Sequence, residues 1–200
     1  MKPAAAEITR VRASSSYFRE LGRVLARVDS ALVDQIANAV WQTYRQARTV
    51  YLFGNGSGAA LASQFACDLA KGMIVGDHRR LRVVALTDNA SLLTAWANDS
   101  HYDEIFAEQL RNLVEADDLV LGISASGNAR NVMRGLEVAR EAGARIIGFT
   151  SYKGVLLRDR CDLCLVVPSD NMQHVEDVHV SAAHAISNLL SQRMMQREGE

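Results

Sequence analysis

The sequence predicts an α/β fold, a three-layer αβα sandwich on a five-stranded parallel sheet of flavodoxin-like type, preceded by an N-terminal helix pair. Short, continuous apolar segments alternate along the chain with segments of helical period, an order typical of a parallel sheet covered on both faces. Two of the apolar segments end abruptly in turns of glycine, serine and asparagine. With 200 residues and 48% hydrophobic content, we expect one compact domain over residues 1–200.

The predicted domain has two parts, a helical pair over residues 14–46 and an α/β core over residues 49–196. In the pair, apolar residues recur three and four apart on either side of Asp29-Ser30, a sequence that favours a helix cap. Strands are predicted from the apolar runs at 49–53, 81–86, 119–123, 145–150 and 162–167. Core helices are predicted after Gly58 and at 89–97, 103–116, 129–143, 155–158 and 174–193.

The charge of the chain is almost balanced, with 22 Lys and Arg against 23 Asp and Glu and no basic run. This balance gives no electrostatic reason for binding nucleic acid or a membrane surface. Residues 1–16 contain no apolar core of signal-peptide length, and no segment approaches the ~20 apolar residues of a membrane span. We therefore expect a cytoplasmic protein without a nucleic-acid or membrane partner.

Three cysteines are too few for a disulfide scaffold. Cys161 and Cys164 form a C-x-x-C motif, which could indicate redox chemistry or half of a metal site. The motif runs into a predicted strand rather than opening a helix, and no second pair completes a zinc site. These features favour buried structural thiols over chemistry.

The turn Gly54–Gly58, with the sequence GNGSG, follows the first strand and opens the first core helix. Backbone N–H groups and the positive end of a helix dipole meet at such a turn, which suits a phosphate or another anion. Because residue 59 is alanine and no G-K-[ST] follows, the turn is neither a dinucleotide fingerprint nor a P-loop. We expect no nucleotide cofactor. The alternative is a tight turn that uses glycine only for its backbone freedom.

The turn Ser124–Asn128, with the sequence SASGN, follows a second buried strand. Hydroxyl and amide groups at a helix N-terminus bind phosphate without Lys or Arg. The alternative is ordinary capping, in which Ser126 or Asn128 completes the helix. One residue would suffice for a cap, so the presence of several polar residues with glycine favours anion binding.

Side chains on two predicted helices could carry proton transfer. Glu176 and His184 are eight residues apart on the last helix, so they can share one side of it. Gln64 and Asp68 are four apart on the first core helix, and Asp68 has apolar neighbours. Asp68 is therefore either a surface residue or a general base. The alternative for His184, and more strongly for His179, is a hydrogen-bonded core histidine.

Four segments of the sequence, GNGSG, ALTDNASLLTAWAND, LGISASGN and VEDVHVSAAH, together resemble the SIS (sugar isomerase) family. The resemblance covers nearly the whole chain, and it implies a phosphosugar isomerase that interconverts an aldose and a ketose. The expected substrate is sedoheptulose 7-phosphate, and the product is a heptose 7-phosphate. The resemblance also implies a homotetramer with sites between subunits, so that Asp68 and His184 would meet across an interface.

The resemblance assigns roles to individual residues of this sequence. The substrate-binding residues would be Asn55, Gly56, Ser57, Asp99, Ser124, Ser126, Asn128 and Glu176. Asp68 would be the general base, and His184 would be its partner acid. A zinc ion would be held by Gln64, Asp68, Glu176 and His184.

Several of these positions depart from the family pattern. The family base is usually glutamate, so Asp68 is one methylene shorter. Gln64 replaces a histidine ligand, and its amide is a poorer zinc ligand than an imidazole, whereas Glu176 adds a carboxylate in place of a glutamine. Ala129 stands where a further serine is common. The alternative function is therefore a non-catalytic SIS protein that binds a sugar phosphate or a protein partner such as the bacterial replication initiator.

Overall fold

The computed structural model describes residues 14–198, so the parts of the predicted domain at 1–13 and 199–200 lie outside the described residues. Five parallel strands form one sheet in the order β2-β1-β3-β4-β5, which confirms the predicted α/β sandwich. The strands are β1 (Thr49–Gly54), β2 (Arg82–Ala85), β3 (Leu119–Ile123), β4 (Arg145–Ser151) and β5 (Leu163–Val167). The helices are α1 (Ser14–Leu25), α2 (Ser30–Arg45), α3 (Ser57–Gly72), α4 (Ala90–Asp99), the 3₁₀ turn η1 (Tyr102–Glu104), α5 (Ala107–Leu113), α6 (Arg130–Glu141), α7 (Val155–Arg158) and α8 (Met172–Glu198).

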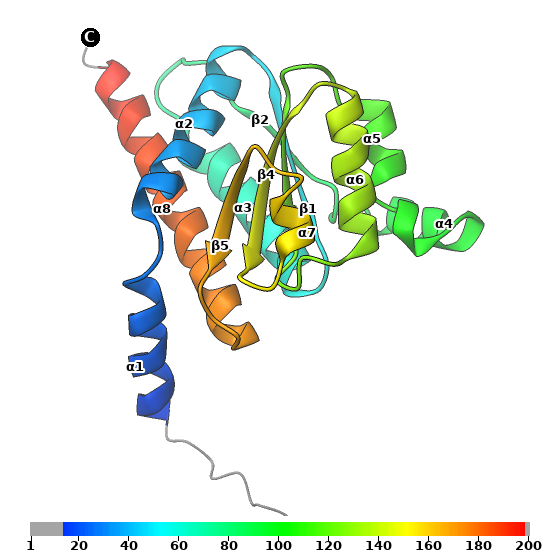
Figure 1. The fold of residues 1–200 in the computed structure, drawn as a ribbon. Helices are drawn as coiled ribbons and strands as arrows, with labels where there is room; N and C mark the ends of the chain where they lie inside the picture. Colours follow the sequence, from blue (N-terminus) through cyan, green and yellow to red (C-terminus); the bar gives the residue numbers. More distant parts are fainter. Residues whose placement is uncertain (1–13, 199–200) are drawn as a thin grey trace, which may run out of the picture.

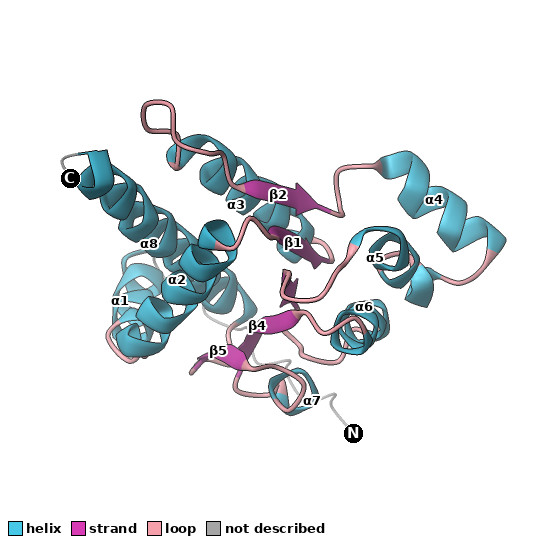
Figure 2. Ribbon diagram, turned by 90° about the horizontal axis from the view of Figure 1, so that it is seen from above, coloured by secondary structure: helices cyan, strands magenta, loops and turns pink. Residues whose placement is uncertain are grey.

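The central strands are buried on both faces, which explains their continuous apolar sequences. In β1, Val50 and Leu52 join the core formed with α2, α3 and α8. The alternate residues Tyr51 and Phe53 join the core formed with α5 and α6. Seen from above, these two helical layers lie on opposite faces of the sheet (Figure 2).

Two elements illustrate where the structure differs from the prediction. The edge strand β2 is four residues long rather than 81–86, and most of its side chains are not buried, because it pairs only with β1. The helix predicted over 103–116 is divided into η1 and α5, although Ile105, Phe106 and Leu110 are buried as its pattern required. Apolar spacing thus predicted the buried face of this segment but not its backbone hydrogen bonds.

Two helices stand out from the body of the domain (Figure 1). α1 contacts the beginning of α8, where the Tyr17 hydroxyl donates a 2.5 Å hydrogen bond to Oδ2 of Asp177. It leaves Phe18 on the surface with 68% of its area exposed. α4 projects from the opposite side, and none of its residues is buried.

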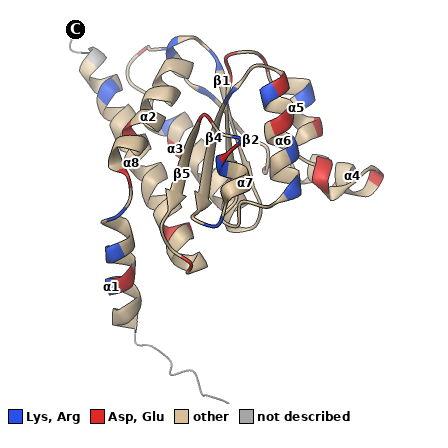
Figure 3. Cartoon of the chain, viewed as in Figure 1, with Lys and Arg blue, Asp and Glu red and all other residues tan. Residues whose placement is uncertain are grey.

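The surface carries no single dominant charge on its helical layers. On α5 and α6, basic and acidic residues are interspersed (Figure 3), and many of them pair, as Arg134 does with Glu104 at 3.1 Å and with Glu137 at 2.7 Å. Within residues 14–198, no helix is both long and apolar enough to cross a membrane.

Candidate active site

A cavity of about 420 Å³ opens at the carboxyl ends of β1 and β3. These strands are neighbours in the sheet, but the helices that follow them, α3 and α6, pack on opposite faces. Ligands of doubly wound sheets bind at this reversal of the winding direction. The cavity is lined by both small-residue turns and by the beginning of α8, namely Asn55, Gly56, Ser57, Gly58, Leu61, Ile123, Ser124, Ala125, Ser126, Ala129, Met172, Glu176, His179 and Val180.

Glycine is required where these two turns approach other backbone segments. A Cβ atom on Gly54 would lie 2.7 Å from the carbonyl oxygen of Ile123, so a side chain there would push β1 away from the end of β3. Gly127 has a φ of 68°, which favours glycine. A Cβ on Gly127 would also lie 2.1 Å from Cα of Gly154. The walls of the cavity are therefore held close together by residues that have no side chain.

The helices that begin at the cavity have no side-chain caps. The N-cap residues of α3 and α6, Gly56 and Ala129, make no side-chain hydrogen bond to the first turn, although within α6 the N–H of Val132 donates to Oδ1 of Asn131 at 2.9 Å. By contrast, Asp29 caps α2 and Asn89 caps α4, both away from the cavity, with hydrogen bonds of 3.1 Å. Ser126 and Asn128 are therefore not helix caps, and the first turns of α3 and α6 keep N–H groups that suit an anion.

The serine hydroxyls of the second turn are arranged as donors. Ser124 Oγ accepts a hydrogen bond from the backbone N–H of Gly127 at 3.2 Å, and Ser126 Oγ accepts one from Asn128 at 3.4 Å. Each oxygen thus accepts from the backbone while its own O–H proton stays available to a ligand. Among the described residues that line the cavity there is no lysine or arginine. The site can bind a phosphate through neutral donors alone.

Asn55 is held in place by two residues that the sequence did not single out. Its side-chain amide exchanges two hydrogen bonds of 2.8 Å with the amide of Asn131, which is buried at the beginning of α6. The Tyr102 hydroxyl donates a third hydrogen bond, of 3.1 Å, to Oδ1 of Asn55. Asn55 thus acts as a brace between the two turns. No local sequence signal could reveal this pair, since its members are 76 residues apart.

His179 is a core histidine, as its apolar surroundings in the sequence suggested. Its side chain is 1% exposed, and Nε2–H donates to the carbonyl oxygen of Thr150 at 3.2 Å. Burial lowers the pKa of His179 to about 4, so the ring is neutral near pH 7. The ring closes one side of the cavity, and Glu176 lies one helical turn earlier on the same wall.

Asp68, His184 and Gln64 form a cluster where α3 packs on α8. Gln64 Nε2 donates a 2.8 Å hydrogen bond to Nε2 of His184, which places the imidazole proton on Nδ1. Asp68 Oδ2 lies 3.7 Å from the same ring nitrogen. This oxygen is buried and has no hydrogen-bond partner within the described part of the chain. The expectation that Asp68 and His184 meet across an interface was wrong, because α3 and α8 bring them together within one chain.

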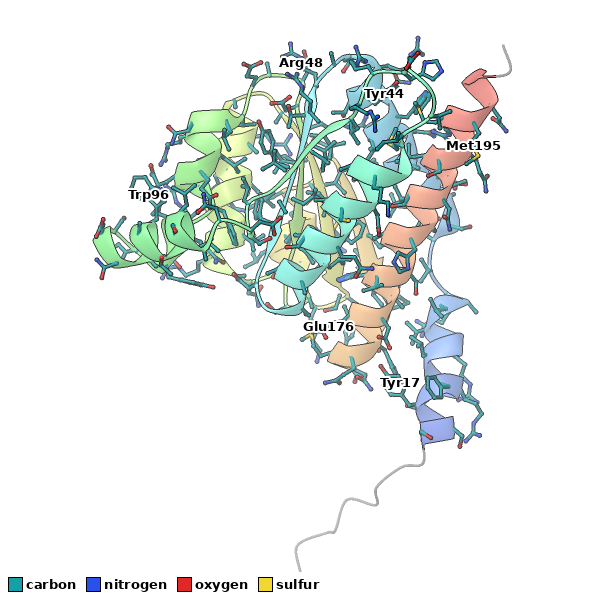
Figure 4. All side chains as sticks on the ribbon, turned by 180° about the vertical axis from the view of Figure 1, so that it is seen from behind. Tyr17, Tyr44, Arg48, Trp96, Glu176 and Met195 are labelled. Carbon is teal, nitrogen blue, oxygen red and sulfur yellow. The ribbon has the colours of Figure 1, made fainter. Side chains whose placement is uncertain are left out.

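The cluster and the cavity are nevertheless separate. Asp68 and His184 line a second hollow of about 570 Å³ that contains neither small-residue turn. Glu176 lies near the amino end of α8, far from Met195 at the other end (Figure 4). His184 is eight residues further along than Glu176, or ~12 Å along the helix axis. Sharing one side of a helix therefore does not bring Glu176 to His184.

The predicted zinc ligands do not fit zinc within one chain. Gln64, Asp68 and His184 converge, but only Asp68 and His184 carry groups that zinc prefers, and the Gln64 amide occupies the His184 nitrogen that faces Asp68. Glu176, the fourth predicted ligand, lies at the cavity instead. Residues 14–198 contain no group of three His, Cys, Asp or Glu that could hold a metal ion.

Two predicted substrate-binding residues do not line the cavity. Asn128 is exposed just beyond it. Asp99 falls between the helices predicted at 89–97 and 103–116, but it is the last residue of the projecting helix α4, and it accepts a 2.7 Å hydrogen bond from Asn98. The other predicted residues of the two turns, and Glu176, do line the cavity.

The sequence of this chain is similar to those of known proteins over most of its length. The model of the SIS domain matches residues 16–151. The chain belongs to the SIS domain family. A phosphoheptose isomerase of Geobacter sulfurreducens is 38% identical over 176 residues, which cover 88% of each protein. A phosphoheptose isomerase of Thermodesulfovibrio yellowstonii is 33% identical over 180 residues, which cover 90% of this SIS chain and 85% of the relative.

Solved structures extend the similarity to the fold. A phosphoheptose isomerase from Neisseria gonorrhoeae superposes with a TM-score of 0.83 at 29% identity, covering 90% of this SIS chain and 97% of the other. One from Francisella tularensis superposes with a TM-score of 0.84 at 27% identity, covering 90% and 96%. The fold of this SIS protein is therefore shared over nearly the full length of both enzymes.

Proposed function

We propose that this SIS protein is a phosphosugar isomerase that interconverts sedoheptulose 7-phosphate and a heptose 7-phosphate. The observation that carries the proposal is the anion-binding cavity at the β1–β3 switch point, together with the Asp68–His184 pair that lines a second hollow of the same chain. Identities of 33–38% with phosphoheptose isomerases support the choice of substrate.

In this proposal the substrate phosphate lies between the two small-residue turns. The hydroxyls of Ser124 and Ser126 and the first-turn N–H groups of α3 and α6 donate to the phosphate oxygens. The positive ends of both helix dipoles face the phosphate, which offsets the lack of a basic side chain. Asn55 and Asn131 keep the two turns at a fixed separation.

The proton transfers fall to Asp68 and His184. Asp68 removes the proton from the carbon next to the carbonyl and returns it to the neighbouring carbon, because its Oδ2 has no competing donor. His184, with its proton on Nδ1, protonates the carbonyl oxygen and then takes the proton of the adjacent hydroxyl. The substrate passes through an enediol, and no net proton is gained or lost.

A second copy of the chain completes the site in this proposal. The turns that hold the phosphate and the residues that move protons line different hollows of one chain. A partner subunit that brings its own Asp68–His184 cluster to the phosphate cavity would place the cluster and the two turns together, beside Glu176. The projecting helix α1, with Phe18 exposed, offers apolar surface for such an assembly. We take the assembly to be the homotetramer implied by the family resemblance.

The test of the proposed activity is direct. The purified protein is incubated with sedoheptulose 7-phosphate, and the aldose product is followed by NMR. The Asp68→Asn variant is expected to lose ~10²–10⁴-fold in kcat, because it removes the general base. Its affinity for the sugar phosphate, measured by calorimetry, should stay within about threefold, because the phosphate is bound by the two turns and not by Asp68.

The matched control is Asp77→Asn, at an exposed position that lines no described cavity. It should leave both turnover and affinity unchanged. Tight binding of the sugar phosphate without turnover by the wild-type protein would contradict the isomerase proposal and favour the non-catalytic alternative. Equal turnover by Asp68→Asn and wild type would remove Asp68 from the mechanism.

A further inference from the structure

The C-x-x-C motif has no part in the proposed isomerase site. Cys161 lies in the connection between α7 and β5. Cys164 lies in β5, where it pairs with Gly148 of β4. Both cysteines pack against the core that lies with α5 and α6, the face of the sheet opposite α3 and α8. Asp68 and His184 belong to α3 and α8, so the two thiols lie away from the residues proposed for the proton transfers.

The two thiols lie close to each other. The side chains of Cys161 and Cys164 both lie over Gly148. A Cβ atom on Gly148 would be 2.5 Å from the sulfur of Cys161 and 3.1 Å from the sulfur of Cys164. The missing side chain of Gly148 therefore makes the space in which the sulfur atoms meet. Both cysteines are only partly buried.

The surroundings of the two thiols differ. The neighbouring thiol of Cys161 lowers the pKa of Cys164, and the positive charge of Arg158 adds to this effect against burial. For Cys161, the proximity of Cys164 and burial raise the pKa. The S–H proton of Cys161 is donated to the carbonyl oxygen of Leu157 at 3.1 Å. Cys164 is thus the more reactive thiol of the two, and Cys161 is held beside it as a protonated partner.

We propose that Cys161 and Cys164 are a redox-active pair that closes reversibly into an intramolecular disulfide. The Cys164 thiolate attacks one sulfur of a small-molecule disulfide such as oxidised glutathione. The sulfur–sulfur bond of that molecule breaks, and one thiolate leaves. Cys161 then gives its proton to solvent and attacks the sulfur of Cys164, which displaces the second thiolate. Two protein thiols are oxidised, and one small disulfide is reduced to two thiols.

The test uses the wild-type protein in buffers of reduced and oxidised glutathione, quenched with acid and alkylated with N-ethylmaleimide. After trypsin digestion, residues 161–193 form one peptide that carries both cysteines, and residues 49–71 form another that carries Cys67. We expect the 161–193 peptide to lose both alkylation sites together and to become lighter by two hydrogen atoms. The exposed Cys67 should instead carry one glutathione. Separate glutathione adducts on Cys161 and Cys164, or full alkylation of both while Cys67 is oxidised, would overturn the proposal.

Single variants test the order of attack. In Cys161→Ser, Cys164 has no resolving partner and should accumulate a glutathione adduct. In Cys164→Ser, the adduct on Cys161 should form about tenfold more slowly. Cys67→Ser is the matched control, and it should leave closure of the pair unchanged. A faster adduct on Cys161 than on Cys164 would overturn the assigned roles.

Discussion

Asn55 and Asn131 exchange two hydrogen bonds of 2.8 Å between their side-chain amides, and this exchange joins the turn after β1 to the helix after β3. The pair can affect binding of the substrate even if neither residue contacts the reacting carbons. The separation of the two turns sets the width of the phosphate cavity, so the amide pair acts on binding through geometry.

Replacing Asn131 with leucine should therefore weaken both the fold and the binding of the sugar phosphate. The change removes both hydrogen bonds and leaves the Asn55 amide unpaired toward α6, at an expected cost of about 2 kcal/mol in the free energy of unfolding. Urea unfolding measures this loss, and calorimetry should show roughly tenfold weaker binding. The exposed Asn128→Ala variant is the control and should change stability by less than about 0.5 kcal/mol. Equal effects of the two variants would contradict the role of the Asn55–Asn131 pair in holding the two turns together.

Mixed assemblies should distinguish a site within one chain from a site shared between chains. One inactive variant carries Asp68→Asn, and the other carries Ser124→Ala with Ser126→Ala. If each site combines the cavity of one chain with Asp68 of another, random co-assembly restores about a quarter of the sites. Turnover by the co-expressed, doubly tagged assembly measures this recovery.

The control for that experiment is co-expression of two differently tagged Asp68→Asn chains, which should stay inactive. A mixed assembly that contains both variants but is as inactive as its parents would place the whole site within one chain. Light scattering of the wild-type protein, in parallel, tests the proposed tetramer.

The substitution Gln64→His should create a three-ligand metal site where α3 packs on α8. An imidazole at position 64 would replace the amide that now occupies His184 Nε2 and would give zinc three preferred ligands. We expect this variant to retain about one zinc ion per chain after dialysis, as measured by mass spectrometry of the metal. Gln64→Asn, which adds no imidazole, should retain none. Stoichiometric zinc in the wild-type protein would contradict the conclusion that Gln64, Asp68 and His184 do not fit zinc.

Stability should depend on pH through His179. Its pKa is about 4 in the folded chain against 6.5 in the unfolded chain, so the unfolded state binds more protons between these values. Stability from this residue is therefore fully present above pH 6.5 and falls as the pH drops toward 4, by about 3 kcal/mol in total. Urea unfolding from pH 4 to pH 7 should show this slope, and His179→Gln should flatten it. The exposed His101→Gln variant should keep the wild-type slope.

The sequence predicted those features that depend on local pattern. β3 could be predicted because a strand buried on both faces leaves a continuous apolar run, and both small-residue turns could be predicted because glycine and serine mark tight connections. The division of the 103–116 segment was missed, since apolar spacing does not determine backbone hydrogen bonds. The Asn55–Asn131 pair was also missed, because a buried amide looks like any other polar residue until its distant partner is known.

The candidate site shows the same limit. Angular spacing placed Glu176 and His184 on one side of a helix, yet the rise along the axis puts them in different hollows. Asp68 approaches His184 only through the packing of α3 on α8. Sequence reasoning could name these residues, but the way in which the chain groups them is a property of its tertiary structure.

The missing caps of α3 and α6 have one further consequence, for the energetics of ligand binding. A bound phosphate would serve as the cap that the chain itself does not provide, so the ligand would complete two elements of secondary structure at once. Part of the binding free energy would then be spent on ordering the first turns of these helices. The free protein should therefore exchange its amide hydrogens faster at Ser57, Arg130 and Asn131 than the complex does, because the amides that follow them, Gly58 and Val132, already have hydrogen-bond partners within the chain. The beginnings of α2 and α4, which Asp29 and Asn89 already cap, should exchange at the same rate in both states.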